Sequence, residues 1–132
     1  KINLKVVEKG FKLKSSTTQV LNILEKGGIK ELIYYHPPEI EYNKYIQYLN
    51  DYAFFLSETD RYKEAIPILE KVINLSPERV VAYLNLGDCY YKEYQKSNKK
   101  SDKEKVIENY KKYVSLLKKG AKIPERVSLF LK

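Results

Sequence analysis

An apolar pattern in the middle of the chain recurs after 34 residues. The first copy consists of Leu49, Tyr52, Ala53 and Leu56, and the second of Tyr83, Leu86, Gly87 and Tyr90. Spacings of three and four residues place these side chains along one side of a helix. The small residues Ala53 and Gly87 lie within that side, where they let a second helix approach closely. A glycine inside a helix costs about 1 kcal/mol relative to alanine, so Gly87 indicates a close packing contact.

Each copy of the pattern continues into a second helix, so we expect each repeat to form a helical hairpin. In the first repeat we expect one helix from residues 38–39 to about 57–60 and a second over about 62–75, with Ala65 facing its partner. Pro77 ends the second helix because proline has no amide hydrogen to donate. Proline also fits the first turn of the helix that follows.

The second repeat is longer than the first. Leu56 and Ala65 are nine positions apart, whereas Tyr90 and the equivalent Val106 are sixteen apart. The seven extra residues fall in the polar stretch 92–105.

We expect these extra residues to lengthen both helices of the second hairpin. No helix breaker follows Tyr90, so the first helix should continue through Tyr94 and leave 97–100 as the loop. Tyr94 should then pack against Tyr110 or Val106. A serine followed three residues later by a glutamate, at 101–104, has the form of a capping box and predicts the start of the next helix there.

The pattern begins a third time near the end of the chain. Residues 123–127 repeat residues 76–80 with one difference. The helix before them should end at 118–120, where two lysines precede a glycine. We expect the last residues to form one helix whose apolar side covers the open face of the second hairpin.

The period and the order of these residues resemble the tetratricopeptide (TPR) repeat, over about residues 38–132. The resemblance implies a protein-interaction module in which the first helix of each hairpin lines a concave groove. The positions that match this groove are Gln47, Asn50, Phe54, Ser57 and Glu58 in the first repeat and Val81, Leu84, Asp88, Tyr91 and Lys92 in the second. Such a groove suits an apolar or basic peptide, or a helix of a partner. The alternative is that these side chains are merely exposed, or buried under the N-terminal segment.

One TPR subtype is not implied. Members that clamp the C-terminal carboxylate of a heat-shock chaperone use a lysine and an asparagine where this sequence has Asn50 and Phe54.

The first 37 residues do not share the repeat. Residues 2–6 alternate apolar and polar with the period of a strand, 8–10 have the composition of a turn, and 11–13 resume the alternation. A short helix capped at Ser16 should follow and close at Gly27-Gly28. Residues 29–33 fit either a helix or a strand.

The expected fold class is therefore all-α: a TPR-like array of helical hairpins, about two repeats plus a C-terminal capping helix, with a small α/β N-terminal segment. We expect residues 1–37 either to cap the 38–132 domain or to be the tail of a preceding domain, and we favour the second. The first residue is not a methionine, so we expect the chain to be part of a longer protein or a processed product.

The basic character of the chain leaves a second function open. It has 25 Lys and Arg against 17 Asp and Glu, a net charge of +8, and lysines can bind phosphates by displacing counterions. The lysines that would serve a nucleic-acid-associated helical repeat are Lys96, Lys99, Lys100, Lys103 and Lys105. A solvated surface is the competing interpretation, because acidic residues lie among these lysines and the chain has only three arginines for bidentate contacts.

The sequence contains no recognisable catalytic arrangement. The only histidine, His36, lies beside two prolines without metal-ligand spacing, so we expect a surface loop residue. The only cysteine, Cys89, lies in the apolar pattern and should be a packed thiol. There is no phosphate-binding glycine loop and no run of about 18 apolar residues, so we expect no cofactor, no metal and no membrane span. The prediction is a non-enzymatic protein–protein interaction module that binds a peptide or helix of a partner protein.

Overall fold

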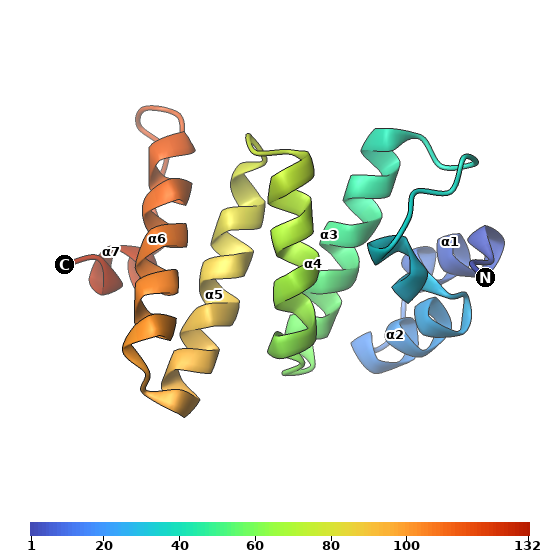
Figure 1. Ribbon diagram of the computed structural model, residues 1–132, viewed down its shortest axis with the longest axis horizontal. Coiled ribbons are helices and arrows are strands. Elements are labelled where there is room, and N and C mark those ends of the chain that lie inside the picture. Colours follow the sequence, from blue (N-terminus) through green and yellow to red (C-terminus); the bar gives the residue numbers. More distant parts are fainter.

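The protein is helical throughout, without a β-strand, in a computed structural model that describes residues 1–132. Its elements are α1 (Leu4–Lys12), α2 (Thr17–Lys26), the 3-10 helix η1 (Ile29–Ile33), α3 (Tyr42–Glu58), α4 (Tyr62–Leu75), α5 (Val80–Ser97), α6 (Lys100–Leu116) and α7 (Glu125–Phe130). Helices α3 to α6 stand side by side in a row, with α1 and α2 at one end and α7 at the other (Figure 1).

The N-terminal segment is helical, so the prediction of a small α/β segment is wrong. Helix α1 begins after Asn3, whose side-chain oxygen accepts a hydrogen bond from the backbone N–H of Val6 at 3.3 Å. Val7 on this helix is completely buried. Gly10, which we expected in a turn, lies inside α1 because α2 packs onto it: a Cβ atom there would lie 2.9 Å from the Leu24 side chain.

The rest of this segment is helical as well. The Ser16 hydroxyl accepts a hydrogen bond from the backbone N–H of Gln19, which confirms the predicted cap of α2. Gly28 adopts a left-handed conformation with φ of 82°, and η1 follows it. Residues 29–33 are therefore helical and not a strand.

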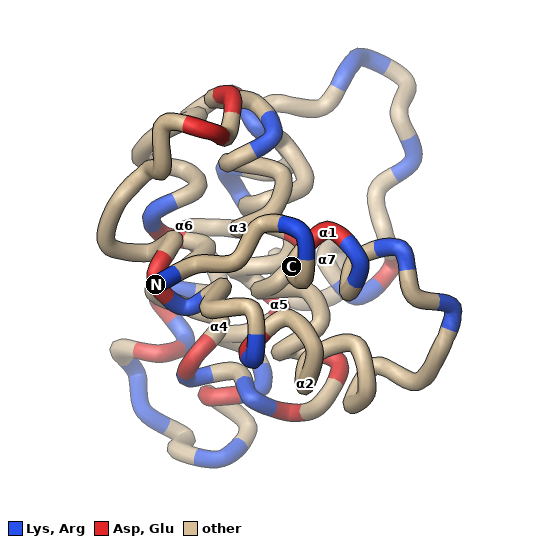
Figure 2. The backbone as a smooth tube through the Cα atoms, turned by 90° about the vertical axis from the view of Figure 1, so that its right-hand side faces the viewer, with Lys and Arg blue, Asp and Glu red and all other residues tan.

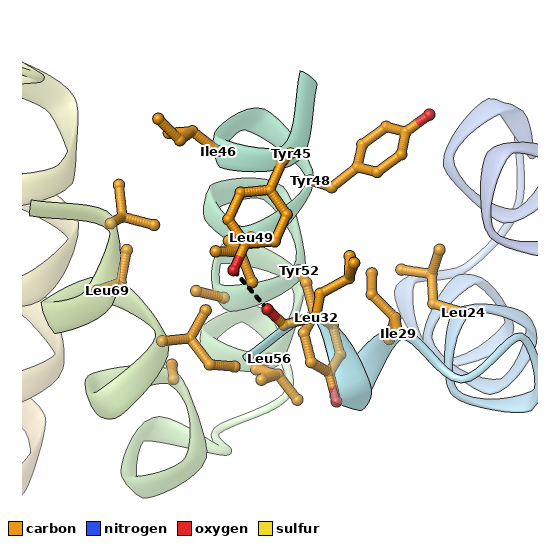
Figure 3. Packing of buried hydrophobic residues seen from close by; sticks show 14 of the residues in the cluster. Leu24, Ile29, Leu32, Tyr45, Ile46, Tyr48, Leu49, Tyr52, Leu56 and Leu69 are labelled. Atoms are coloured by element: carbon orange, nitrogen blue, oxygen red, sulfur yellow. Dashed lines mark hydrogen bonds between the residues drawn. The ribbon is translucent and has the colours of Figure 1, made fainter. Parts of the chain in front are cut away.

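The N-terminal helices share a core with α3. Leu24, Ile29 and Leu32 belong to the same cluster of buried side chains as Leu49 and Leu56 of α3 (Figure 3). Burial of such side chains typically contributes about 1.5–3 kcal/mol each. These helices therefore add apolar contacts that two hairpins alone would lack.

Aromatic and polar contacts join the same surfaces. The Phe11 ring stacks on the Tyr48 ring with centroids 4.8 Å apart, and the Tyr45 hydroxyl donates a hydrogen bond to the Leu32 carbonyl at 2.7 Å (Figure 3).

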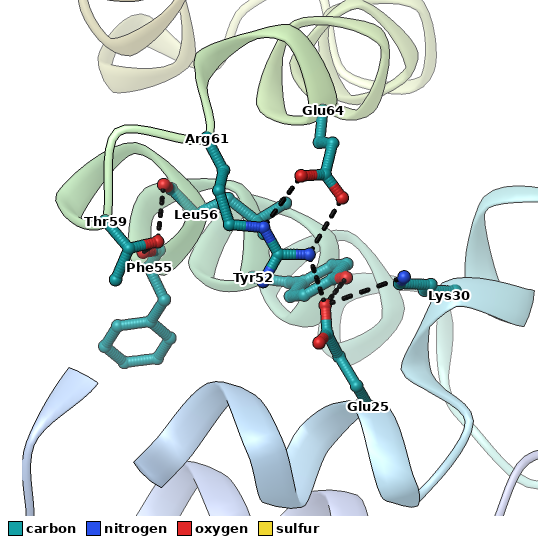
Figure 4. A network of polar contacts seen from close by, with 8 residues as sticks. All are labelled: Glu25, Lys30, Tyr52, Phe55, Leu56, Thr59, Arg61 and Glu64. Atoms are coloured by element: carbon teal, nitrogen blue, oxygen red, sulfur yellow. Dashed lines mark hydrogen bonds and ion pairs between the residues drawn. The ribbon is translucent and has the colours of Figure 1, made fainter. Parts of the chain in front are cut away.

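A cluster of polar side chains links α2 to the first hairpin (Figure 4). The Glu25 carboxylate accepts hydrogen bonds from the Tyr52 hydroxyl at 2.7 Å and from the Arg61 guanidinium at 2.9 Å. Arg61 also donates two hydrogen bonds to Glu64, at 2.7 and 2.8 Å. Burial would raise the pKa of Glu25, but these hydrogen bonds outweigh it and the pKa is lowered.

The two repeats form two hairpins, α3–α4 and α5–α6. In the first, the small residues Ala53 and Ala65 are completely buried. In the second, a Cβ atom on Gly87 would lie 2.4 Å from the Tyr110 ring. Only glycine leaves room for this ring, which is the close contact that the sequence pattern indicated.

The second hairpin is the longer one, as the extra residues predicted. Helix α5 continues to Ser97, which confirms the extension past Tyr94. The loop contains only Asn98 and Lys99 and is shorter than the expected 97–100. The predicted capping box is wrong: Ser101 is exposed inside α6, and the residue at the N-cap is Lys99.

Helix α7 covers part of this hairpin. Val127 is completely buried, and the Phe130 ring meets the rings of Tyr91, Tyr94 and Tyr110 edge-on, with centroids 5.4, 6.2 and 5.9 Å apart. Tyr94 is half-buried and packs on the cluster that contains Tyr110 and Val106, in agreement with the prediction.

Candidate peptide-binding groove

A hollow of about 310 Å³ lies where α3, α5 and α7 converge, with the first residue of α4 at its edge. These three helices are the first helices of the two hairpins and the short helix that begins the third copy of the pattern. We call this hollow the groove pocket. Six of the ten predicted groove residues line it: Phe54, Ser57, Glu58, Asp88, Tyr91 and Lys92.

The repeat explains why these six side chains meet. Residues three and four positions apart lie on the same side of a helix, so Phe54, Ser57 and Glu58 share one side at the end of α3. Asp88, Tyr91 and Lys92 occupy the same three positions 34 residues later, on α5. Because α3 and α5 are equivalent helices of consecutive hairpins, both sets face the same space.

The groove pocket has apolar walls. The Phe54 ring is 44% exposed and offers an apolar surface to the hollow. Tyr62 and Tyr91 are half-buried beside it. The Cys89 thiol is almost fully buried, and burial raises its pKa to about 12, so it remains protonated and inert near neutral pH. The predicted packed thiol is thus confirmed.

Asp88 is bonded to other helices of the molecule. Its carboxylate accepts hydrogen bonds from the Tyr110 hydroxyl at 2.6 Å and from two nitrogens of Arg126, on α7, at 3.0 and 2.8 Å. The bond to Asp88 raises the pKa of Arg126, and burial together with the bond to Asp88 raises that of Tyr110. Arg126 therefore neutralises Asp88. The remaining charged side chains, Glu58 and Lys92, are exposed and form no ion pair within 4.0 Å.

The other four predicted residues lie outside the groove pocket: Gln47, Asn50, Val81 and Leu84. Gln47 donates a hydrogen bond to Asp51 at 2.8 Å and accepts one from Arg79 at 2.6 Å. Val81 is 45% exposed and Leu84 is half-buried.

Asn50 differs from these neighbours because its side chain is buried without a full set of partners. It is only 6% exposed, and its side-chain oxygen accepts no hydrogen bond. Buried polar atoms in folded proteins are almost always hydrogen-bonded, so this oxygen is a free acceptor one helical turn before Phe54. The Nε atom of Arg79 is the other buried side-chain polar atom without a partner.

Four further residues line the groove pocket that the sequence did not indicate: Tyr62, Asn85, Cys89 and Arg126. Tyr62 and Asn85 lie outside the five positions that were carried between repeats. Arg126 could have been found, because residues 123–127 copy the residues that lead into α5 and so predict that α7 packs beside it as the next repeat would. Cys89 was assigned to the core, and it is both a core residue and the floor of the pocket.

The basic residues of the alternative function lie at the turn between α5 and α6. Lys96, Lys99, Lys100, Lys103 and Lys105 are all exposed. The Lys96 ammonium lies 5.7 Å from the centre of the Tyr62 ring, within the range of a cation–π contact. Lys105 forms an ion pair with Glu108 at 3.7 Å.

The molecule contains no group of three or more His, Cys, Asp and Glu side chains that could hold a metal ion. His36 is an exposed loop residue, as predicted. Its ring lies tilted against the Tyr45 ring, with centroids 4.5 Å apart, and a ring nitrogen contacts the Ile40 carbonyl. None of the helices is both long and apolar enough to cross a membrane.

Comparison with known proteins finds no family model and no curated protein that matches this chain.

Proposed function

We propose that the protein is a non-enzymatic, TPR-like interaction module that holds a short segment of a partner protein in the groove pocket. The observation that carries this proposal is the convergence of six side chains, implied as groove positions by the TPR resemblance, on one hollow between α3, α5 and α7. A concave, partly apolar hollow with a few polar groups is the usual form of a recognition site.

The chemistry of the groove pocket suits an apolar anchor residue beside polar or charged ones. A volume of about 310 Å³ accommodates one or two side chains, and Phe54 and Tyr91 offer ring surfaces for them. Glu58 and Lys92 are free to pair with charges of either sign.

The test begins with peptides selected from a random library on the wild-type protein. Their affinities are then measured by calorimetry for the wild type and for a Phe54→Ala, Tyr91→Ala variant. We expect the variant to lose affinity by roughly tenfold or more, as is typical for aromatic residues at the centre of an interface. Circular dichroism must show that it remains folded, because Tyr91 also packs on Phe130.

A matched control removes two aromatic rings elsewhere. Tyr34 and Tyr35 are 81% and 44% exposed and lie in the loop before α3, far in sequence from the groove pocket. The Tyr34→Ala, Tyr35→Ala variant should bind the selected peptides as the wild type does. Unchanged affinity in the folded Phe54→Ala, Tyr91→Ala variant would remove the groove pocket from the proposal.

A further inference from the structure

Nearly all of the net charge of the protein lies in one part of the chain. Residues 96–122, which contain α6 and its flanking loops, hold ten lysines and only three acidic residues. This segment therefore carries +7 of the total of +8. No acidic residue occurs between Glu108 and Glu125, a stretch that contains five lysines.

These lysines are not neutralised within the fold. All ten are exposed, and only Lys105 has a carboxylate within 4.0 Å, that of Glu108. Elsewhere in the molecule lysines do find partners: Lys44 pairs with Glu8 at 3.4 Å. Charge of one sign concentrated in this way repels itself and produces a strong local potential.

The lysines at the start of α6 do not serve the stability of that helix. Lysines stabilise the C-terminal end of a helix and destabilise the N-terminal end, because of the helix dipole. Lys99 and Lys100 stand at the N-terminus of α6, with Lys103 in its first turn and a single acidic residue, Asp102, beside them. Only the lysines after Leu116 lie at the favourable end.

We propose that this lysine surface, formed by the lysines of residues 96–122, docks the phosphate backbone of a nucleic acid without reading its bases. Five lysines of α6 lie between Lys100 and Lys112, and further lysines flank the helix at both ends. Its 17 residues span about 25 Å at about 1.5 Å per residue. A regularly charged polymer matches a positive surface of that length better than a single anionic group does.

The same surface lacks the groups that would read bases. The only arginines are bonded elsewhere: Arg61 to Glu25 and Glu64, Arg79 to Gln47 and Arg126 to Asp88. No bidentate arginine is therefore available for a base edge.

Large apolar side chains are not exposed on this surface either. The exposed large apolar side chains of the whole molecule are Tyr34, Tyr35, Tyr42, Phe54, Val81 and Leu129. None of them lies within residues 96–122. The lysine surface therefore has no ring for base stacking and no side chain for insertion into a membrane. Attraction between lysines and phosphates is the interaction that remains.

The test compares two variants of equal charge. One replaces five lysines of the acid-free stretch by glutamine: Lys111→Gln, Lys112→Gln, Lys118→Gln, Lys119→Gln and Lys122→Gln. The control makes the same change at five exposed, unpaired lysines of the N-terminal helices: Lys5→Gln, Lys9→Gln, Lys12→Gln, Lys14→Gln and Lys26→Gln.

Binding of a fluorescent DNA duplex and a fluorescent single-stranded RNA, each of about 25 nucleotides, is followed by anisotropy between about 50 and 200 mM salt. We expect the wild type to bind both and to weaken steeply with salt. The variant with the five substitutions between Lys111 and Lys122 should lose roughly tenfold or more in affinity. The magnitude of its slope of log K against log salt concentration should fall by up to about 4. The N-terminal variant should retain most of the affinity and slope.

Four results would overturn the proposal. The first is that the wild type binds neither nucleic acid at about 50 mM salt, and the second is that the two variants lose affinity equally. The third is that the wild type binds polyglutamate more tightly than either nucleic acid, and the fourth is that it binds vesicles containing phosphatidylserine more tightly than either nucleic acid. The third would assign the lysine surface to an acidic protein and the fourth to a membrane. None of the four bears on the groove pocket, whose residues are unchanged in both variants.

Discussion

At the scale of single residues, the contact between Gly87 and Tyr110 determines how closely α5 and α6 approach. Alanine is the better helix former by about 1 kcal/mol, yet a Cβ atom at Gly87 would lie 2.4 and 2.5 Å from two atoms of the Tyr110 ring. The ring is almost fully buried and cannot move away. We expect Gly87→Ala to lower the free energy of unfolding by about 1–3 kcal/mol, measured by urea denaturation.

A double-mutant cycle isolates this clash. In a Tyr110→Val background the ring is absent, so Gly87→Ala should cause no further loss and should restore part of the helix propensity. An equal loss in both backgrounds would show that the ring is not the cause.

Residue patterns in the sequence predict which residues share one face of a helix better than they predict which side chains bond to one another. The groove positions that the TPR resemblance implies include Phe54 and Tyr91, and these two side chains do line one hollow. It could not show that Asp88 is bonded to Arg126, 38 residues away, because that pairing depends on how α7 folds back. The unpaired oxygen of Asn50 was also invisible, since burial and hydrogen bonding are properties of the packed state.

At the scale of elements, the sequence predicted the repeats well and α1 poorly. Residues 2–6 alternate like a strand, but Leu4, Val7 and Phe11 also recur at helical spacing, and tertiary packing decided between the two periods. Gly10 suggested a turn, yet its missing side chain serves the approach of α2. The extension of α5 was predictable because its apolar spacing continues to Tyr94 without a helix breaker.

The polar cluster at Glu25 should hold the N-terminal helices to the first hairpin. Glu25→Gln replaces a carboxylate that accepts hydrogen bonds from Tyr52 and Arg61. We expect it to lower the free energy of unfolding at pH 7 by about 1–3 kcal/mol, the usual effect of losing bonds to a charged group. The measurement is urea denaturation, with Glu39→Gln, at an exposed loop position, as a control that should have little effect.

The effect of Glu25→Gln should also depend on pH. Because the pKa of Glu25 is lowered in the folded protein, its carboxylate stabilises the fold above the ordinary pKa of 4.5, and this contribution is lost as pH falls below that value. The stability difference between wild type and variant should therefore shrink in acid. A difference that stays constant down to about pH 2 would contradict this assignment.

The turn between α5 and α6 depends on a left-handed residue. Asn98 has a φ of 54°, which asparagine tolerates better than alanine does and glycine tolerates best. We expect Asn98→Ala to lower the free energy of unfolding by about 1 kcal/mol and Asn98→Gly to leave it unchanged or raise it slightly, as measured by urea denaturation. The reverse order of the two variants would show that φ at this position does not control the turn.

At the scale of the whole molecule, two groups of buried side chains hold the array together. The larger has 21 residues and joins α1, α2 and η1 to the first hairpin and to one side of α5, through Ala82, Leu86 and Cys89; the smaller has five and joins α6 and α7 to α5. Helix α6 therefore depends on the smaller group, to which α7 contributes Val127 and, beside it, Phe130. This arrangement explains why α7 both completes the smaller core and forms one wall of the groove pocket.

Buried thiol and phenol groups should make the stability of the protein fall at alkaline pH. Burial raises the pKa of the Cys89 thiol from 9.0 to about 12. Burial, together with the hydrogen bond to Glu8, raises that of Tyr48 from 10.0 to about 12. Between the ordinary and the raised pKa the unfolded chain has lost a proton that the folded protein retains. The free energy of unfolding must therefore fall as pH rises, by about 1.4 kcal/mol per pH unit for each such group.

We expect urea denaturation to show this decline beginning near pH 9 and steepening toward and above pH 10, where Tyr48 and the other tyrosines of raised pKa, Tyr52, Tyr62, Tyr90 and Tyr110, contribute together with Cys89. The Cys89→Ala variant separates the two groups. Although less stable at pH 7 because of the lost packing, it should lose stability less steeply than the wild type between pH 9 and 10, because only the tyrosines of raised pKa then contribute to the decline. A wild-type stability that is constant from pH 9 to about 11 would contradict the burial of these protons.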